Sequence, residues 1–321
     1  MTKYIVQRLL LIVPTILLLT LLVFILMRVL PGDVVQLILG DASGGFVSKG
    51  GNMSAEVLRE RLGLDRPLHL QYLTWLWDMT RGEFGKSLYS NNPVGGEIAL
   101  RLPITMQLAL MGTILGLLLG IPIGILSAIH QNSWIDNVLR FLSIIFLAVP
   151  SFWLGLVVIL AASIWFNWVP PIGRNAVWEN PRDNLLQLMW PALILASHGM
   201  ATIARMTRST MLEVLREDYI RTARAKGLAE QVVIARHALK NALIPVVTLA
   251  GLTFANLMGG TVILEQIFAI PGMGSFFLDA IQKQDYTIVQ STVVVFAVVF
   301  MLVNLLVDLM YGWLDPRISY S

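Results

Sequence analysis

Six long apolar stretches alternate with polar segments along the 321 residues of this chain. A helix of about 20 residues crosses a hydrocarbon core of about 30 Å, and each stretch reaches that length. The predicted spans are approximately residues 9–30, 103–129, 139–168, 186–206, 243–264 and 288–311. This pattern predicts an all-α polytopic membrane protein with six transmembrane helices. The even number places both termini on one side.

A polar island separates the fourth and fifth spans, from Arg208 to Asn241. It is too charged to cross a bilayer core, so we expect it to lie at the membrane surface. One helix is predicted to end near Lys226, with Gly227 as its C-cap, because glycine accepts the left-handed conformation there. A second helix is predicted from about Glu230 to Leu243. Its apolar face is predicted to contain Leu228, Val232, Ala235 and Leu239.

The basic residues of the short loops set the expected orientation, because short cytoplasmic loops are enriched in Lys and Arg. One side carries Lys3, Arg8, Arg140, Arg208, Arg216, Arg221, Arg224, Lys226, Arg236, Lys240 and Arg317. The other side carries only Arg174, Arg182 and Lys283 in its short loops. We therefore expect both termini and the polar island to be cytoplasmic. The long segment 31–102 is then extracytoplasmic, with helical pieces near Ala55–Leu62 and Leu70–Met79.

Small residues and prolines mark places where the spans pack or bend. Glycines recur every four residues at Gly112, Gly116, Gly120 and Gly124, and Gly251, Ala255 and Gly259 repeat that spacing in the fifth span. Such a stripe lets another helix backbone approach closely. Pro150 is expected to kink the third span.

Composition agrees with a membrane protein and excludes several classes of site. Hydrophobic residues make up 56% of the chain and charged residues 13%, against about 25% charged in soluble domains. The chain has no cysteine, so it has neither disulfides nor zinc-thiolate sites. The four histidines are scattered, and we expect no metal site. The modest net charge of +3 gives no sign of a nucleic-acid partner.

The island carries a specific resemblance. Asp218-Tyr219-Ile220-Arg221-Thr222-Ala223-Arg224-Ala225-Lys226-Gly227, followed by His237 to Pro245, resembles the cytoplasmic coupling loop of binding-protein-dependent ABC transporter permeases. The dipeptide, oligopeptide and nickel branch is the most similar. The general pattern is Glu-Ala-Ala, three residues, then Gly; here Arg221-Thr222-Ala223 takes the first three positions, and Pro245 comes later than expected. Residues 265–274 and 314–320 also resemble this family. A basic surface helix that merely follows membrane topology is the alternative.

The resemblance implies a permease subunit of an ATP-driven importer in a prokaryotic inner membrane. The implied partners are a second homologous permease subunit, two ABC ATPase subunits and an extracytoplasmic solute-binding protein. ATP and Mg would bind the ATPases, and this chain would be neither an enzyme nor the holder of a cofactor. Contact with the ATPase would fall to Asp218, Tyr219, Arg221, Thr222, Ala223, Arg224, Ala225, Lys226 and Gly227. The implied organisation is a first transmembrane helix at 1–30, an extracytoplasmic region at 31–102, and a permease core at 103–321 with its coupling loop at 208–242.

Peptides are the substrate that the resemblance favours, with nickel chelates, glutathione and oligosaccharides as alternatives. A passive channel, a secondary carrier and a membrane scaffold are the competing functional classes. A carrier driven by ions places ionisable groups deep in its spans. Of the titratable residues here, His198 is the main one near a span centre. The sequence thus favours a driving force supplied by a partner.

Four polar residues are candidates for the translocation pathway: Gln107, His198, Asn256 and Glu265. The amides of Gln107 and Asn256 could contact a peptide backbone, and His198 could line the path. Hydrogen bonds between helices explain Gln107, His198 and Asn256 equally well. Asp33, Glu265 and Asp285 could contribute to an outer gate or to the docking surface for a binding protein, and solvation in a loop is the simpler expectation for each.

Overall fold

The computed structural model describes residues 2–29, 65–173 and 177–314, which form helices joined by turns and loops. The expected helical piece at Ala55–Leu62 and the gate candidate Asp33 lie outside these residues. The described chain divides into two compact units. The first contains residues 2–4, 104–173, 177–271 and 302–314, and the second contains 5–29, 65–103 and 272–301. Each is described by itself.

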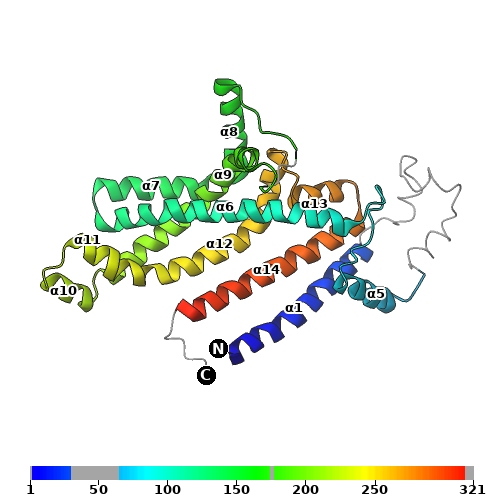
Figure 1. Cartoon of the computed structure of the whole chain (residues 1–321), viewed down its shortest axis with the longest axis horizontal. Coiled ribbons are helices and arrows are strands. Elements are labelled where there is room, and N and C mark those ends of the chain that lie inside the picture. Colours follow the sequence, from blue (N-terminus) through cyan, green and yellow to red (C-terminus); the bar gives the residue numbers. More distant parts are fainter. Residues whose placement is uncertain (1, 30–64, 174–176, 315–321) are drawn as a thin grey trace. The chain divides into compact units, whose positions relative to one another are not determined.

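The first unit is a bundle of long helices (Figure 1). In chain order its main elements are most of α6 (Val94–Ile129), α7 (Trp134–Ala148), α8 (Ser151–Phe166), α9 (Pro181–Val214), α10 (Asp218–Ala225), α11 (Glu230–Val232), the π-helical turn η1 (Val233–Ala238), α12 (Leu239–Ile267) and the last part of α14 (Tyr286–Leu314). Helix α9 packs along both α7 and α12. One core cluster joins Leu108, Leu188, Leu195, Leu264 and Phe268.

The glycine stripe of α6 packs closely against another helix, as predicted, and the structure shows that this helix is α9. A Cβ built on Gly120 would stand 2.8 Å from the carbonyl oxygen of Met200, and one on Gly124 would stand 2.5 Å from Cβ of Thr207. Gly251 of α12 is similarly crowded by Val307. The expectation for Gly259 is wrong, because a Cβ there would meet open space in this chain.

The third predicted span is broken. Helix α7 ends at Ala148, α8 begins at Ser151, and the two helices meet at 98°. Pro150 stands between them with φ of −63°; it has no N–H to continue the hydrogen-bond ladder of α7. The predicted kink is confirmed. Five helices in the described residues are long and apolar enough to cross a membrane, and the bent pair is a sixth candidate.

The polar island begins inside a helix. Helix α9 continues to Val214 and α12 starts at Leu239, so both extend beyond the predicted span limits of 206 and 243. Arg208 therefore lies on α9, and no separate surface helix begins there. Helix α12 also runs past 264 to Ile267, which places Glu265 inside the helix.

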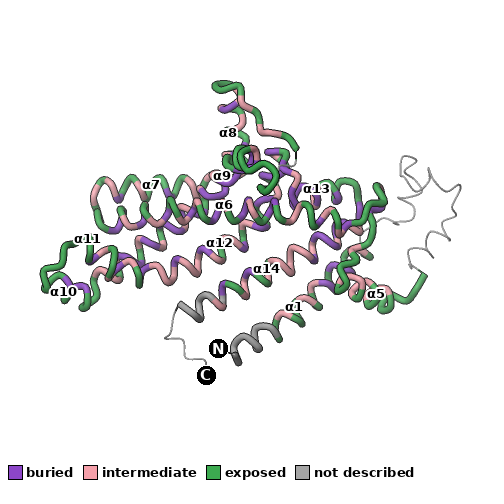
Figure 2. The backbone as a smooth tube through the Cα atoms, viewed as in Figure 1, coloured by how far each residue is buried: buried purple, intermediate pink, exposed green. Residues whose placement is uncertain are grey.

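The second unit contains α1 (Thr2–Val29, from residue 5), α5 (Leu68–Thr80), α13 (Met273–Gln282), the start of α6 and the start of α14 (Tyr286–Leu314). Figure 2 shows buried positions on α13 and the first turns of α14. Val94, Ile98, Met273, Phe276 and Ile288 form their shared core. The helix predicted at Leu70–Met79 is confirmed by α5.

Asp285 is buried in this unit, with 2% of its surface exposed, so the expectation of loop solvation is wrong for it. Its carboxylate accepts hydrogen bonds from Ser87 Oγ at 2.6 Å, the Leu88 N–H at 3.0 Å and the Ile288 N–H at 3.3 Å. The residue thus caps α14 and holds the turn that leads into α6.

We expect Asp285→Asn to lower the stability of the second unit by about 1–3 kcal/mol, because an amide cannot accept all the hydrogen bonds of a buried carboxylate. The thermal unfolding midpoint of the purified chain in detergent measures the loss. Asp279→Asn is the matched control, since Asp279 is exposed on α13. Equal midpoints for the two variants would contradict the assigned role of Asp285.

Candidate functional site

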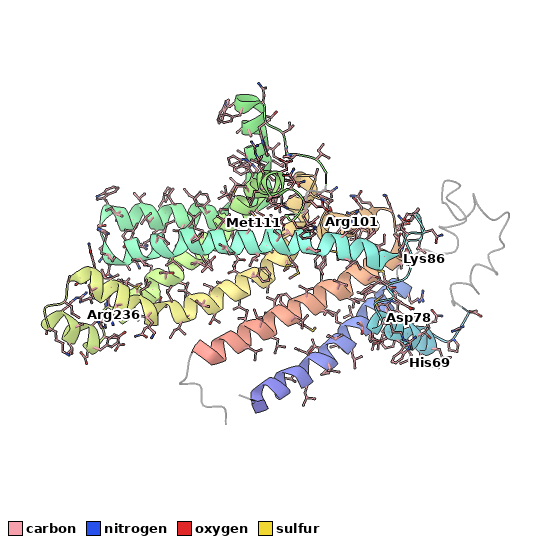
Figure 3. All side chains as sticks on the ribbon, viewed as in Figure 1. His69, Asp78, Lys86, Arg101, Met111 and Arg236 are labelled. Atoms are coloured by element: carbon pink, nitrogen blue, oxygen red, sulfur yellow. The ribbon has the colours of Figure 1, made fainter. Side chains whose placement is uncertain are left out.

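The candidate site is α10, an eight-residue helix in the loop between α9 and α12. Asp218 lies in its first turn and Arg224 in its last, so both charges complement the helix dipole. The Gly227 N–H donates to the Arg224 carbonyl at 2.9 Å, and Gly227 has a φ of +79°. The predicted left-handed glycine at the end of this helix is confirmed, and it directly follows the C-cap residue Lys226. The helix lies at one end of the first unit, where Figure 3 also places Arg236.

One face of α10 is buried. Ile220 has no exposed surface and Ala223 is 7% exposed, and both pack in a cluster with Ala128 of α6, Met211 of α9 and Val233 of η1. We call this group, which also includes Ala238 and Ala242, the loop core. Alternation of buried and exposed residues every three to four positions is the pattern of a helix that lies on a packed surface. The loop core therefore fixes α10 to the ends of three long helices.

The other face of α10 is exposed and polar. The exposed residues are Asp218, Tyr219, Arg221, Thr222, Arg224, Ala225 and Lys226. Of the nine residues predicted to contact a partner, Ala223 is thus the one that points inward, and its contribution would be to packing. The remaining eight, with Gly227, are exposed in this chain.

Polar contacts hold the loop in one conformation. Arg224 donates to Glu230 through Nη2 at 2.6 Å and Nε at 3.1 Å, which closes the turn at Gly227. These hydrogen bonds raise the pKa of the Arg224 guanidinium above its ordinary value. Asn241 Nδ2 donates to the Tyr219 hydroxyl at 2.8 Å and so ties α10 to α12. Arg221 contacts Asp218 at 3.3 Å in an exposed pair of little energetic weight.

The predicted apolar face of the segment after Gly227 is wrong except at Leu239, which is half-buried and packs against the loop core. Leu228, Val232 and Ala235 are exposed, and the buried residues are Val233, Ala238 and Ala242. The π-helical turn η1 is the physical reason. Its wider turn shifts the helical phase, so residues five positions apart face the same way across it.

Two of the four pathway candidates, Gln107 and Glu265, are hydrogen-bonded to a neighbouring helix, and the other two are exposed. Gln107 of α6 and Asn184 of α9 exchange hydrogen bonds through their amides, with the Asn184 Nδ2 to Gln107 Oε1 distance at 3.2 Å. Glu265 is fully buried in α12 and accepts from Thr105 Oγ1 of α6 at 2.7 Å. Loop solvation is therefore wrong for Glu265.

His198 on α9 and Asn256 on α12 are exposed at the surface of this chain. The structure does not gather the four candidates into one site. It instead reveals Asn184 and Thr105 as partners that the sequence reasoning missed. Their positions beside Gln107 and Glu265 depend on helix pairing, which no local pattern shows.

Two family models cover almost the whole chain. Residues 120–320 match the binding-protein-dependent transport system inner membrane component, and residues 1–109 match the N-terminal model of the membrane component of such systems. The chain belongs to this family. It is accordingly a transport component of the inner membrane, and the resemblance expected from the polar island is confirmed.

Relatives within the family match from end to end. The oligopeptide transport system permease protein AppB of Bacillus subtilis is 41% identical over 323 residues, with all of both chains covered. The dipeptide transport system permease protein DppB of Alkalihalophilus pseudofirmus is 39% identical over 344 residues with the same coverage. The glutathione transport system permease protein GsiC of Escherichia coli K12 is 36% identical over 321 residues, again over both full chains.

A solved structure supports the fold of this inner membrane component. An inward-facing MetNI methionine ABC transporter chain superposes with a TM-score of 0.55, covering 68% of this chain and 96% of the other. The two sequences are 18% identical. This likeness concerns the fold alone.

Proposed function

We propose that this chain is one of two homologous permease subunits of an ATP-driven importer, and that α10 docks in a groove of an ABC ATPase subunit. The observation that carries the proposal is the two-sided character of α10. Its apolar face is anchored in the loop core and its polar face is exposed. A short helix held in this way suits docking into a groove on a partner.

The proposed topology places both termini on the same side of the membrane as α10. With α7 and α8 taken as one broken span, the chain crosses the membrane six times, and both termini lie in the cytoplasm with α10. The asymmetry of Lys and Arg between short loops supports this orientation. The first helix at 1–30, an extracytoplasmic region at 31–102 and a core at 103–321 remain the proposed topological division. The coupling loop at 208–242 belongs to the core.

The proposed mechanism is alternating access. ATP and Mg bind to the ATPase subunits, and closure of the ATPase pair displaces α10. Since α10 is packed against the ends of α6, α9 and α12, a displacement of α10 moves those helices with it. A nucleotide can drive such a change only through different contacts in the two states, which the docked helix would supply.

We propose peptides as the transported class, delivered by an extracytoplasmic solute-binding protein. The relatives are named for dipeptides, oligopeptides and glutathione, all of which contain amide bonds between amino acids. Nickel chelates and oligosaccharides are the alternatives. Uptake of labelled dipeptides by vesicles, in competition with each alternative, distinguishes them.

Docking predicts a position-specific effect on α10. We expect Ala225→Trp to lower recovery of the ATPase with the tagged chain at least tenfold. This factor corresponds to a loss of about 1.4 kcal/mol in binding free energy. Ala225 is exposed on α10, so its side chain can grow without disturbing the loop core. Recovery is measured by quantifying the ATPase that copurifies in mild detergent.

The control is Ala148→Trp, the same change at an exposed position near the end of α7. We expect this variant to retain the ATPase at the level of the unmodified chain. Equal recovery with both variants would remove α10 from the proposed interface.

A further inference from the structure

Asp136 is a fully buried carboxylate near the start of α7. Arg208 of α9 binds both of its oxygens, with Nε at 2.8 Å from Oδ1 and Nη2 at 2.7 Å from Oδ2. Ser127 Oγ donates to Oδ1, and the Asn132 N–H donates to Oδ2 at 3.0 Å. All these donors meet one charge, so the carboxylate is well compensated for its removal from water.

The donors come from three different segments. Ser127 is near the end of α6, Asn132 lies in the turn before α7, and Arg208 lies on α9. Asn132 has a φ of +61°, a conformation that asparagine adopts more readily than most residues. Asp136 thus joins α6, the α6–α7 turn and α9 at one point.

Two residues that hold or contact Asp136 lie close in sequence to residues of the loop core, which packs against α10. Ser127 precedes Ala128, and Arg208 lies three residues before Met211; both Ala128 and Met211 belong to the loop core. Residues three apart lie on neighbouring positions of one helix face. The α9 turn that supports α10 therefore also carries the guanidinium that holds α7.

The Asp136 side chain has no exposed surface, whereas the Arg208 side chain keeps 21% of its surface exposed. Such an ion pair is a poor choice for stability alone, because the buried charge must lose its water, and apolar residues of similar volume often stabilise a core equally well or better. What a bidentate guanidinium–carboxylate pair provides is fixed distance and orientation. At this position it ties the first turn of α7 to α9, and α7 leads on to the bend at Pro150 before α8.

We propose that Asp136 and Arg208 are positioning residues that transmit displacement of α10 to the broken span α7–α8. The loop core moves α9, and the ion pair makes α7 follow α9. This proposal rests on the proposed docking of α10 to an ATPase. It adds a specific route from that helix into the membrane.

The test uses the whole transport complex in proteoliposomes, with ATP hydrolysed and labelled dipeptide transported measured together. Arg208→Lys keeps the positive charge and loses the bidentate geometry. Asp136→Asn keeps the shape and removes the charge. We expect each to reduce dipeptide transported per ATP hydrolysed at least tenfold, while the ATPase subunits stay bound and active.

Glu97→Gln is the matched control, because Glu97 pairs with Arg101 at 3.0 Å in the second unit. It should leave the transport ratio unchanged. A purely structural role for Asp136 would lower the yield of folded complex and leave that ratio intact.

An unchanged ratio in assembled Arg208→Lys and Asp136→Asn complexes overturns the proposal. So does failure of both variants to assemble, which would make the pair a requirement for folding. Measurements on the unmodified chain distinguish failure of this proposal from failure of the proposed function. If it recovers no ATPase and transports without ATP, the docking itself is wrong.

Discussion

A chain carrying Gly227→Pro should insert into the membrane normally and lose at least nine-tenths of its ATP-driven uptake. Gly227 has a φ of +79°, whereas proline holds φ near −65°, so the turn after α10 cannot form as it does here. Proline also removes the N–H that bonds to the Arg224 carbonyl. Proline at a position whose native φ it cannot adopt destabilises a protein by more than about 1 kcal/mol. Uptake and ATP hydrolysis are measured on the same vesicles.

Crowding cannot produce this effect, since a Cβ on Gly227 would have no atom within 4 Å. Gly227→Asn should therefore retain most of the uptake, because asparagine tolerates the left-handed region. Gly82 is an unusually close match for a control: its φ is +78°, it too has open space around its Cβ, and its N–H bonds to the Met79 carbonyl at 3.1 Å. Equal loss of uptake for Gly82→Pro and Gly227→Pro would show that the turn after α10 has no special role.

Gly124→Leu should prevent folding of the first unit, and Gly124→Ala should weaken it severely. The added Cβ would lie 2.5 Å from Thr207 Cβ and 2.6 Å from the Ala204 carbonyl oxygen. Because the second atom belongs to the α9 backbone, no side-chain rotation relieves the contact and the helices must separate. Overpacking of this kind costs about 1–3 kcal/mol, and more where backbone moves. The fraction of folded chain in detergent and its unfolding midpoint measure the loss.

Gly116→Ala is the control for that experiment, on the same helix and facing the same partner. Its Cβ would stand 3.4 Å from the nearest atom, the Met200 nitrogen, which is an ordinary contact. We expect its midpoint to fall much less than that of Gly124→Ala. A reversed order of the two alanine variants would contradict the packing of α6 on α9.

The elements that sequence reasoning found share one property: each depends on neighbours along the chain. Long apolar stretches give helices, a four-residue glycine spacing gives a packing face, and Gly227 gives a left-handed turn. The proline that bends the third span was visible for the same reason. Its angle of 98° was not visible, because it depends on how α7 packs on α9 and how α8 packs on α12 and α9.

What the sequence missed depends on contacts between distant segments. The sequence suggested that Glu265 and Asp285 are solvated acids in loops. In the structure Thr105 of α6 donates a hydrogen bond to Glu265, and Ser87 in the turn before α6 donates one to Asp285. Asp136 gave no sign that Arg208 lies beside it, 72 positions away. The prediction of the apolar face after Gly227 was wrong for another reason. It relied on a period of 3.6 residues, and the π-helical turn η1 departs from that period.

The most direct test of an ATP-driven importer is purification of the tagged chain from native membranes in mild detergent, with the bound proteins identified and ATP hydrolysis assayed. We predict recovery of ATPase subunits and a second, homologous membrane subunit, with hydrolysis that rises when the solute-binding protein and a dipeptide are added. A chain that purifies alone, shows no hydrolysis and moves dipeptides passively in liposomes would contradict the proposal. The polar face of α10 would then be a solvated surface without a partner.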